Sequence, residues 1–397
     1  MNILFACHRL PFPPKRGGKI RPFNIIRHLS EQGHRVTVGS LARSDEELEE
    51  GRGLADHCHK VHVGRIGKVG AVAQMVARLP TLSPSSMGFF YSRELHSAMR
   101  GEIASGDYDL VFVHCSSAAQ YVREAKNVAS ILDFGDMDSQ KWLDYSGFKP
   151  QPLALGYWLE GTKLVREERR LARRFDVSTC TTRAELETLD ELGAARRTDW
   201  FPNGVDAEFF SPDGGDYDPD AICFIGRMDY YPNQQGMLNF CRAVLPLIRE
   251  THPGATLTIV GASPSREIRD LGSIPGVTVT GTVDDVRPYV RRSALSVAPL
   301  EIARGTQNKI LESMAMGVPV VASDIASRGI DARPGEDFLS ARGDRQFADQ
   351  VLALLRSSEE RARLSAAGRR RVLSHHSWPA SLSRLDRIIE SALAARQ

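Results

Sequence analysis

The chain has 397 residues, of which 42% are hydrophobic and 25% charged, and its formal net charge is +2. This length exceeds what one ordinary hydrophobic core serves and suits two domains of plain globular composition. The near-neutral charge excludes a global field that would select nucleic acid or an anionic membrane, so any such preference must come from local clusters.

The cysteines and the N-terminal residues bear on the compartment. The six cysteines are scattered singly and form no C-x-x-C pair, which is typical of a reducing cytosol rather than of a disulfide framework. No stretch reaches the roughly 18 unbroken apolar residues of a spanning helix. The first residues also lack the basic region of a signal peptide. We therefore expect a cytoplasmic protein, with peripheral contact with the cytoplasmic face of a membrane as the further option.

Strand-like apolar runs alternate with helical stretches through the first half of the chain. A run at residues 3–7 is followed by an amphipathic stretch at 19–32 whose apolar residues fall at helical spacing. Further strands are expected at 35–41, 60–63, 109–114, 130–134, 177–181 and 199–201. This alternation predicts an α/β domain over residues 1–201, with a parallel sheet that helices cover on both faces.

The same alternation resumes in the second half. Residues 202–220 are rich in Pro, Gly and Asp and carry no periodic pattern, which predicts an interdomain linker. Strands are then expected at 222–226, 256–260, 277–280, 295–298 and 319–322. The second α/β domain is predicted over residues 221–376, and an amphipathic helix over the C-terminal segment 377–397.

Candidate ligand-binding residues are sought in the loops after the strands, because open parallel sheets bind ligands at the carboxyl ends of their strands. Arg227 follows the strand that ends at Gly226, and an arginine there can bind phosphate oxygens bidentately. The alternative is a surface arginine in a βα loop, and position alone does not decide between the two.

The segment from Gly305 to Glu312 predicts an anion site at the start of a helix. Thr306 is a natural N-cap, and the helix dipole with the free amides of the first turn attracts an anion, to which Lys309 adds a full charge. Lys309, Glu312 and Ser313 share one face, on which Glu312 can accept hydrogen bonds from a ribose diol. The amides belong to Gly305, Thr306, Gln307 and Asn308. The alternative is a solvated Lys–Glu pair on an ordinary helix.

The residues that follow this segment carry a family resemblance. Met316-Gly-Val-Pro-Val-Val-Ala-Ser323 after Glu312 resembles the donor-binding signature of family 4 glycosyltransferases of the GT-B fold. The resemblance extends to the glycine loop 13–19, the crossing segment 202–206, residues 281–288 and the terminal helix. It implies two doubly wound Rossmann-like domains facing across a cleft, with the acceptor on the first and a nucleotide sugar on the second.

The resemblance also has a subgroup and two departures. Asp136-Met-Asp-Ser-Gln-Lys-Trp142, together with the motifs around Asp229 and Glu312, is similar to sugar transferases of exosortase and exopolysaccharide loci. The family glutamate that contacts the donor sugar, eight residues before Glu312, is replaced here by Arg304. The family lysine after Arg227 is missing as well, which makes Lys309 its candidate replacement.

The first domain supplies further candidates. The resemblance places Gly17 and Gly18, in the loop that also holds Lys15 and Arg16, at the donor diphosphate or the acceptor, whereas the bare pattern is also that of an ordinary turn. His114, at the end of a strand, is expected near the anomeric carbon; the alternative is a structural histidine. The resemblance also places Val283 in the donor site. No G-x-G-x-x-G or P-loop motif supports a dehydrogenase or an ATPase.

Three other patterns have two interpretations each. Asp136-Met-Asp138 reads as the D-x-D of a metal-binding transferase, but we expect one carboxylate to cap the following helix and Asp138 to face the acceptor. A cluster of His57, Cys58, His59 and His62 would be split between faces by strand alternation, so no metal site is expected. The basic residues at helical spacing suit either phospholipid or water, and neighbouring Glu167 and Glu168 favour water. They are Lys163, Arg166, Arg170, Arg173 and Arg174.

These observations predict a glycosyltransferase that uses a UDP- or GDP-sugar, with Arg227, Lys309 and His114 as catalytic residues. The acceptor is expected to be a saccharide or a polyprenyl-diphosphate-linked saccharide of exopolysaccharide or other cell-surface glycan synthesis, with no nucleic acid partner. The resemblance implies retention of anomeric configuration without a metal or other cofactor. Two alternatives are a nucleotide-sugar epimerase on the same fold and a non-catalytic nucleotide-sugar-binding protein, which the residue at Arg304 permits.

Overall fold

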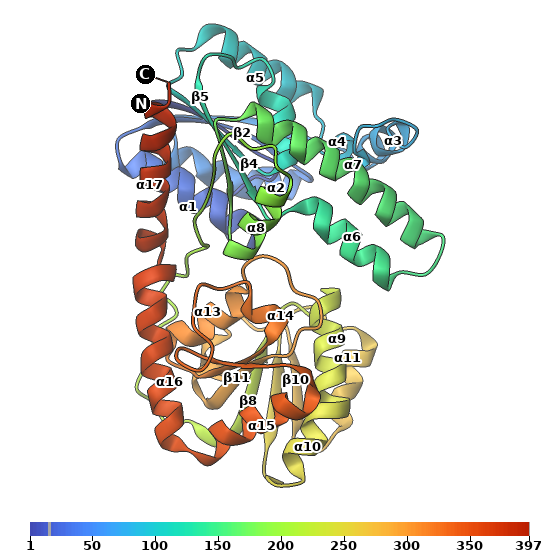
Figure 1. Ribbon diagram of the computed structural model, residues 1–397, viewed down its shortest axis with the longest axis vertical. Helices are drawn as coiled ribbons and strands as arrows, with labels where there is room; N and C mark the ends of the chain where they lie inside the picture. Colours follow the sequence, from blue (N-terminus) through green and yellow to red (C-terminus); the bar gives the residue numbers. More distant parts are fainter. Residues whose placement is uncertain (15–16, 397) are drawn as a thin grey trace. The chain divides into compact units, whose positions relative to one another are not determined.

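A computed structural model describes residues 1–14 and 17–396 of the chain (Figure 1). Lys15 and Arg16, part of the predicted glycine loop, lie outside the described residues. The chain forms two compact units. The first comprises residues 1–201 and 382–397, and the second comprises residues 202–381.

The first unit contains a parallel seven-stranded sheet with the strand order β3-β2-β1-β4-β5-β6-β7. Its strands are β1 (Asn2–Cys7), β2 (Arg35–Ala42), β3 (Lys60–Arg65), β4 (Leu110–His114), β5 (Ala129–Gly135), β6 (Val177–Cys180) and β7 (Thr198–Trp200). Each strand predicted in this half is confirmed. The order reverses between β1 and β4, where Cys7 pairs with His114. This junction is the switch point at which a doubly wound sheet opens a crevice at its carboxyl edge.

Helices cover both faces of this sheet, since every residue of β4 and all but the first of β1 are buried. They are α1 (Gly17–Glu31), α2 (Asp45–Glu50), η1 (Gly51–His57), α3 (Lys68–Ala77), α4 (Ser85–Phe89), α5 (Arg93–Ser105), η2 (Ser116–Val122), α6 (Asp138–Phe148), α7 (Leu153–Arg174) and α8 (Arg183–Glu191). Among the described residues of the whole chain, no helix combines the length and the apolar character of a membrane span.

The second unit contains a parallel six-stranded sheet with the order β10-β9-β8-β11-β12-β13. Its strands are β8 (Asp218–Ile225), β9 (Thr256–Val260), β10 (Val277–Gly281), β11 (Ser293–Ala298), β12 (Val320–Ser323) and β13 (Leu339–Ala341). Five of these strands are confirmed predictions. The sequence did not reveal β13, because three residues at a sheet edge are too few to carry a period of their own.

The helices of the second unit lie between and after these strands. They are α9 (Tyr231–Asn239), η3 (Phe240–Val244), α10 (Leu245–Arg249), α11 (Arg266–Asp270), η4 (Leu271–Ser273), α12 (Arg287–Arg291), α13 (Asn308–Ala315), α14 (Asp324–Ser327), α15 (Gly343–Arg356), α16 (Ser358–Arg371) and η5 (Val372–His376). The predicted C-terminal helix is α17 (Trp378–Ala394), and its residues from Leu382 onward belong to the first unit.

The segment predicted as a linker, residues 202–220, belongs to the second unit. Val205 is buried in the core of that unit, and its amide donates to the carbonyl of His376 over 2.7 Å. The last three residues of the segment form the start of β8. The absence of a periodic pattern therefore reflects an irregular backbone that is nevertheless packed.

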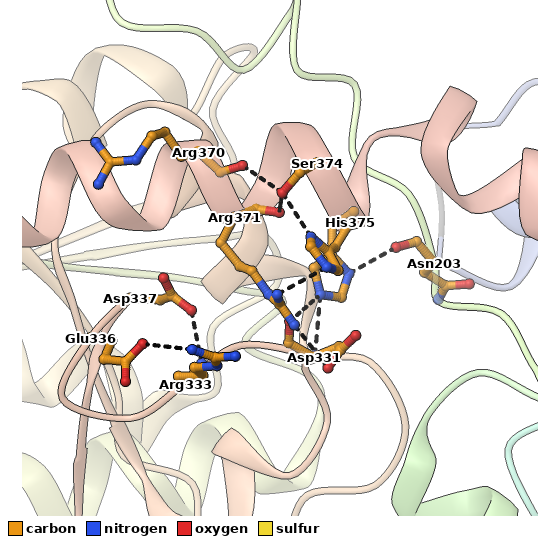
Figure 2. Close-up of polar contacts among 10 residues, drawn as sticks. Asn203, Asp331, Arg333, Glu336, Asp337, Arg370, Arg371, Ser374 and His375 are labelled. Atoms are coloured by element: carbon orange, nitrogen blue, oxygen red, sulfur yellow. Dashed lines mark hydrogen bonds and ion pairs between the residues drawn. The ribbon is translucent and has the colours of Figure 1, made fainter.

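Figure 2 shows Asn203 of this segment and the loop around Asp331, and His376 contacts both. The ring is buried, with Nε2 3.1 Å from the Asp331 amide and Nδ1 3.5 Å from the Asn203 carbonyl. Burial lowers the pKa of His376 to about 4. Arg371 reaches the Asp331 carboxylate over 3.0 Å and completes the cluster. A neutral histidine, held by backbone groups, thus fixes the start of the second unit against its last helices.

Candidate functional site

The candidate site of the second unit lies at the carboxyl ends of β8 and β11, which are neighbours in the middle of the sheet. The order of the strands reverses between them, because β9 follows β8 on one side and β12 follows β11 on the other. The loop at 226–230 and the loop at 299–307 both leave the sheet at this switch point. An open α/β sheet binds its ligand at such a place.

Two glycines let three segments meet here. A Cβ on Gly261, after β9, would lie 1.7 Å from the carbonyl oxygen of Gly226. A Cβ on Gly226 would lie 2.8 Å from Asn233 Nδ2 and 3.3 Å from Lys309 Cε. No side chain fits at either position without moving its neighbours. Gly261 and Asn233 were not among the predicted site residues, although a glycine directly after a central strand is a signal that could have marked Gly261.

Arg227 follows β8 as predicted, and its side chain is half exposed. Its guanidinium binds the carboxylate of Asp229, with Nε 3.0 Å from Oδ1. These hydrogen bonds raise the pKa of Arg227. The predicted phosphate-binding arginine therefore has an intramolecular carboxylate partner, with which a bound anion would share or exchange its donors.

The helix after β11 begins one residue later than predicted, at Asn308. The prediction that Thr306 caps it is wrong, because Gln307 occupies the N-cap position and no side chain caps the helix. Gly305 has φ +63° and turns the backbone. The side-chain amide of Gln307 donates to the Arg304 carbonyl over 3.1 Å. Thr306 Oγ1 and Asn308 Oδ1 are buried without a hydrogen-bond partner among the described residues. Buried polar atoms of this kind are rare and call for a missing partner.

Lys309 and Glu312 lie on one half-buried face of α13. Burial lowers the pKa of Lys309 to about 8 and raises that of Glu312 to about 7, and each charge partly offsets the shift of the other. In the described part of the chain the side-chain carboxylate of Glu312 has no hydrogen bond or ion pair. Lys309 Nζ lies 3.4 Å from Gln307 Oε1 and 5.7 Å from the ring centre of Phe224. Two ionisable groups are thus held in place without the partners that would keep them charged.

Packing places two further residues of this unit. Ser313 was expected on the same face as Glu312, but it is fully buried. The prediction is wrong because the helix is turned so that its wide apolar stripe includes position 313, between Leu311 and Met314. Val283, after β10, packs against the small apolar cluster of Ile225 and Val260.

His114 of the first unit ends β4 and is buried, and it belongs to a polar cluster around Asp133 of β5. Nδ1 of His114 lies 2.7 Å from Asp133 Oδ2. Arg21 of α1 binds both oxygens of the same carboxylate, over 2.8 and 2.9 Å. Thr179 of β6 donates to Oδ1 over 3.0 Å. We call these four residues the Asp133 cluster.

The charges in the Asp133 cluster compensate one another. Burial opposes ionisation of Asp133, but the Arg21 guanidinium and the hydrogen bond with His114 outweigh it and hold the pKa of Asp133 well below its usual range. The next residue after His114, Cys115, has φ +72°, a strained backbone that often accompanies functional sites. An ionised Asp133 accepts a hydrogen bond from Nδ1 of His114 and so fixes the orientation of the ring. Neither Arg21 nor Asp133 was predicted, although an aspartate inside the apolar run of β5 was a visible signal.

The loops after β1 and β2 add cations next to His114. Nδ1 of His8, Nε of Arg9 and Nε of Arg43 are buried and have no hydrogen-bond partner among the described residues. The rings of His8 and Phe90 lie 5.1 Å apart, and the Arg43 guanidinium lies 5.3 Å from the same Phe90 ring. Burial and the nearby charges of His114, Arg9 and Arg43 lower the pKa of His8 far below its usual value. We call Arg9 and Arg43, with His8 between β1 and Arg9, the cationic edge. The sequence analysis did not predict it.

The D-x-D segment does not cap α6, so that prediction is wrong. Met137 occupies the N-cap position, and Asp136 instead accepts a hydrogen bond from Thr181 over 2.8 Å. The amide of Ser139 donates to the buried carboxylate of Glu168 over 2.9 Å. Tertiary structure therefore supplies the cap from α7. Asp138 is the first residue of α6, and burial raises its pKa.

Gly17 and Gly18 begin α1 and are exposed. A Cβ on Gly17 would meet nothing within 4 Å, and one on Gly18 would only touch Arg9. The described part of the chain therefore does not itself require glycine at these positions.

The remaining clusters of the first unit are engaged in local contacts. In the predicted basic face, Arg170 binds Glu167 over 2.8 Å, and Lys163 donates to the carbonyl of Leu79 over 2.8 Å. His62 lies 2.8 Å from Glu102. Across the described residues no three side chains of metal-binding type converge.

Comparison with known families covers most of the chain. Residues 16–209 match the family described as Glycosyltransferase Family 4, and residues 219–357 match Glycosyl transferases group 1. A phosphatidyl-myo-inositol mannosyltransferase of Mycobacterium leprae is 28% identical over 76% of this chain and 78% of its own length. An uncharacterized 44.6 kDa protein in the cps region of Klebsiella pneumoniae is 21% identical over 88% and 90%.

Solved structures with a similar fold include glycosyltransferases. Sucrose-phosphate synthase from Thermosynechococcus elongatus has a TM-score of 0.72 at 16% identity and covers 99% of both chains. Anabaena Alr3699/HepE in complex with UDP has a TM-score of 0.70 at 14% identity and covers 98% of this chain and 100% of its own. At these identities the likeness concerns the fold, and it confirms the predicted pair of Rossmann-like domains.

Proposed function

Because the chain belongs to the glycosyltransferases of the family 4 type, which have the GT-B fold, we propose that it transfers a hexose from a nucleoside-diphosphate sugar to an anionic acceptor of cell-surface glycan synthesis. The observation that carries the proposal is a set of polar groups along α13: Thr306 Oγ1 and Asn308 Oδ1 are buried and have no hydrogen-bond partner among the described residues, and burial raises the pKa of the Glu312 carboxyl. They match the groups that a nucleotide diphosphate presents.

The donor is proposed to bind along α13. Its diphosphate accepts hydrogen bonds from Arg227, Lys309 and the amides of Gly305, Thr306, Gln307 and Asn308, and its ribose diol donates to Glu312. A diphosphate would supply Lys309 with the anion it lacks, and the diol would stabilise ionised Glu312. Val283 is proposed to border the base. The related HepE structures with UDP and with UDP-glucose support UDP as the nucleotide to try first.

Catalysis is proposed to be electrostatic and to retain the anomeric configuration. The departing diphosphate gains charge as the glycosidic bond breaks, and the fixed charge of Lys309 and the helix amides stabilise it in the transition state. These groups supply positive charge without a metal ion. The same phosphate is then proposed as the base that takes the proton of the acceptor hydroxyl.

His114 is proposed to orient the donor sugar. With its proton held on Nδ1 by Asp133, it offers Nε2 as an acceptor to a sugar hydroxyl. Asp138 is proposed to contact the acceptor. The backbone of Gly17 and Gly18 is proposed to contact the acceptor or the diphosphate.

The cationic edge around Arg9 and Arg43 favours an acceptor that carries negative charge. The buried Nε atoms of Arg9 and Arg43 lack partners within the described residues, and phosphate is a natural partner for arginine. A lipid-linked saccharide with a diphosphate fits this chemistry. The relatives named for a phosphatidyl-myo-inositol mannosyltransferase and for a cps region support a lipid acceptor and an exopolysaccharide role, respectively.

A thermal-shift panel of UDP, GDP, ADP and CMP on the wild type and on Glu312→Ala tests the donor site. One diphosphate should stabilise the wild type by RT ln(1 + [L]/Kd), and Glu312→Ala should lose that stabilisation while keeping its own melting temperature. An equal shift in both proteins would remove Glu312 from the site. A wild type that no nucleotide stabilises would overturn the proposal.

A further inference from the structure

Helix α3 of the first unit is apolar but hardly buried. Seven of its ten residues are Val, Ala or Met, yet Ala71 is its one buried residue. Val69 is 86% exposed, and Val72 and Val76 are about half exposed. Leu79 and Leu82, just beyond the helix, are 59% and 76% exposed. A surface helix of a soluble domain normally turns its apolar side chains toward the core, so α3 lacks a partner for its apolar side.

The turn between α6 and α7 exposes a second apolar group. Phe148 ends α6, and Leu153, Leu155, Trp158 and Leu159 belong to the first turns of α7. Each of these five side chains is between 46% and 58% exposed. Apart from Ala154, the buried residues of α7 begin at Glu160, so the first part of this helix extends beyond the core.

The two groups belong to neighbouring elements on one side of the first unit (Figure 1). Lys163 of α7 donates to the carbonyls of Arg78 and Leu79 at the end of α3, over 3.2 and 2.8 Å. Glu160 of α7 accepts from the amides of Ser85 and Ser86 in α4, over 2.9 and 2.8 Å. We call the exposed side chains of residues 68–82 and 148–159 the apolar face.

The apolar face concentrates the exposed apolar surface of the protein. Of the seventeen large apolar side chains that are exposed among the described residues, ten belong to it. Scattered exposed apolar residues are normal on a soluble protein, but a contiguous group marks an interaction surface.

Basic residues outnumber acidic ones along the segments that form the apolar face. Residues 65–93 contain no Asp or Glu and residues 145–159 contain none, while both stretches carry Lys or Arg. Lys68 is exposed, and Arg78 is half-buried. The bordering carboxylates are already engaged: Glu160 binds α4, and Glu167 binds Arg170 over 2.8 Å. The face therefore offers apolar side chains with a local surplus of positive charge.

We propose that the apolar face docks on the surface of a bilayer that contains anionic lipid. Exposed Val, Leu and Trp side chains enter the boundary between headgroups and acyl chains, while Lys68 and its basic neighbours attract the lipid phosphates. Trp and Tyr side chains favour this boundary, and Trp142 and Tyr157 pack beside it with ring centres 4.9 Å apart. The role of this docking, to bring the site to a lipid-linked acceptor, rests on the proposed function; the docking itself does not.

Co-sedimentation of the full chain with vesicles tests the proposal. One set of vesicles is phosphatidylcholine alone, and the other is an equal mixture of phosphatidylcholine and phosphatidylglycerol. The wild type should sediment with the anionic vesicles and far less with the neutral ones. The double variant Val76→Asp with Leu153→Asp should bind at least about tenfold more weakly, because two apolar side chains are replaced by charges that the lipid repels.

A matched control is Leu373→Asp in the second unit, where the side chain is 45% exposed and lies outside the face. It should bind vesicles like the wild type. All three proteins should melt alike and respond alike to nucleotide, so a failure of docking is distinguishable from a failure of the proposed function. Wild type that stays in solution with both vesicles, or a double variant that binds as the wild type does, would overturn the proposal. So would a wild-type dimer that the double variant abolishes without vesicle binding.

Discussion

Buried ionisable groups at the carboxyl edges of the two sheets differ in whether the fold gives them partners. In the Asp133 cluster, Asp133 already has partners in Arg21, His114 and Thr179. On α13, the Glu312 carboxylate has no such partner within the described residues. Burial lowers the pKa of Lys309 and raises that of Glu312, so it favours the neutral form of each. The first arrangement is complete in the folded chain, whereas the second becomes complete only with a ligand. Charge that serves stability and charge that serves binding are thus distinguishable by whether the fold provides the partner.

The largest expected effect comes from breaking the completed cluster. Asp133→Ala leaves the buried guanidinium of Arg21 without its carboxylate, and we expect a loss of about 3–5 kcal/mol in the free energy of unfolding. Urea unfolding measures it. Asp133→Asn, which keeps the shape and one acceptor, should lose less. A loss below about 1 kcal/mol for the alanine variant would show that the cluster is not a compensated buried pair.

A second test compares two buried histidines. His114 has a carboxylate partner, but His376 is held by backbone groups and its pKa is lowered to about 4. The unfolded chain takes up this proton near pH 6.5, so His376 should cost the folded state about 1.4 kcal/mol per pH unit between 6.5 and 4 as the pH falls.

The effect of His376 must be measured as a difference between wild type and His376→Gln. Burial raises the pKa of Glu168 to about 8, and this carboxyl favours the folded state as the pH falls through the same window. Both proteins contain Glu168, so subtraction of their unfolding free energies removes its contribution. The advantage of the wild type should shrink from pH 6.5 to 4. A difference that does not vary with pH would mean that His376 titrates normally.

The incomplete site predicts a narrow pH optimum for nucleotide binding. Affinity should rise as Glu312 ionises near pH 7 and fall as Lys309 loses its proton near pH 8. Calorimetric titration with the preferred diphosphate measures both limbs. Glu312→Gln should remove the acid limb, and Lys309→Met should cost about 1.5–3 kcal/mol of binding. The stability of the Lys309→Met protein should not fall, because the fold supplies this cation with no carboxylate partner.

The smallest expected effect concerns a glycine that the fold does not need. Gly17→Ala places a methyl group in open space, and the free energy of unfolding should change by less than about 0.5 kcal/mol. Sugar transfer should nevertheless slow if a ligand approaches the backbone there. Gly261→Ala is the contrasting variant, since its Cβ would collide with the Gly226 carbonyl and destabilise the second unit. Normal transfer by Gly17→Ala would remove this position from the site.

Much of the fold was readable from the sequence because parallel sheets impose local patterns. Buried strands such as 3–7 and 256–260 are continuous apolar runs, and α17 shows its apolar stripe directly. The position of Glu312 before the Met316–Ser323 motif also sufficed to identify the family. The predicted cap at Thr306 failed, because the turn at Gly305 depends on backbone packing against Gly329, where a Cβ would lie 2.2 Å from the Gly305 carbonyl.

The sequence by itself determined the two α/β units, the family and the location of the donor-binding motif, because these depend on periodicity and on residues close together in the chain. Only the tertiary structure decided how the polar residues pair. Arg21, His114, Asp133 and Thr179 come from four elements spread over more than 150 residues, and they meet because the parallel strands end, and the helices that follow them begin, at one edge of the sheet. The capping of α6 by Glu168 and the exposure of α3 have the same origin. Local pattern fixes what each segment becomes, and long-range packing fixes which groups remain without a partner.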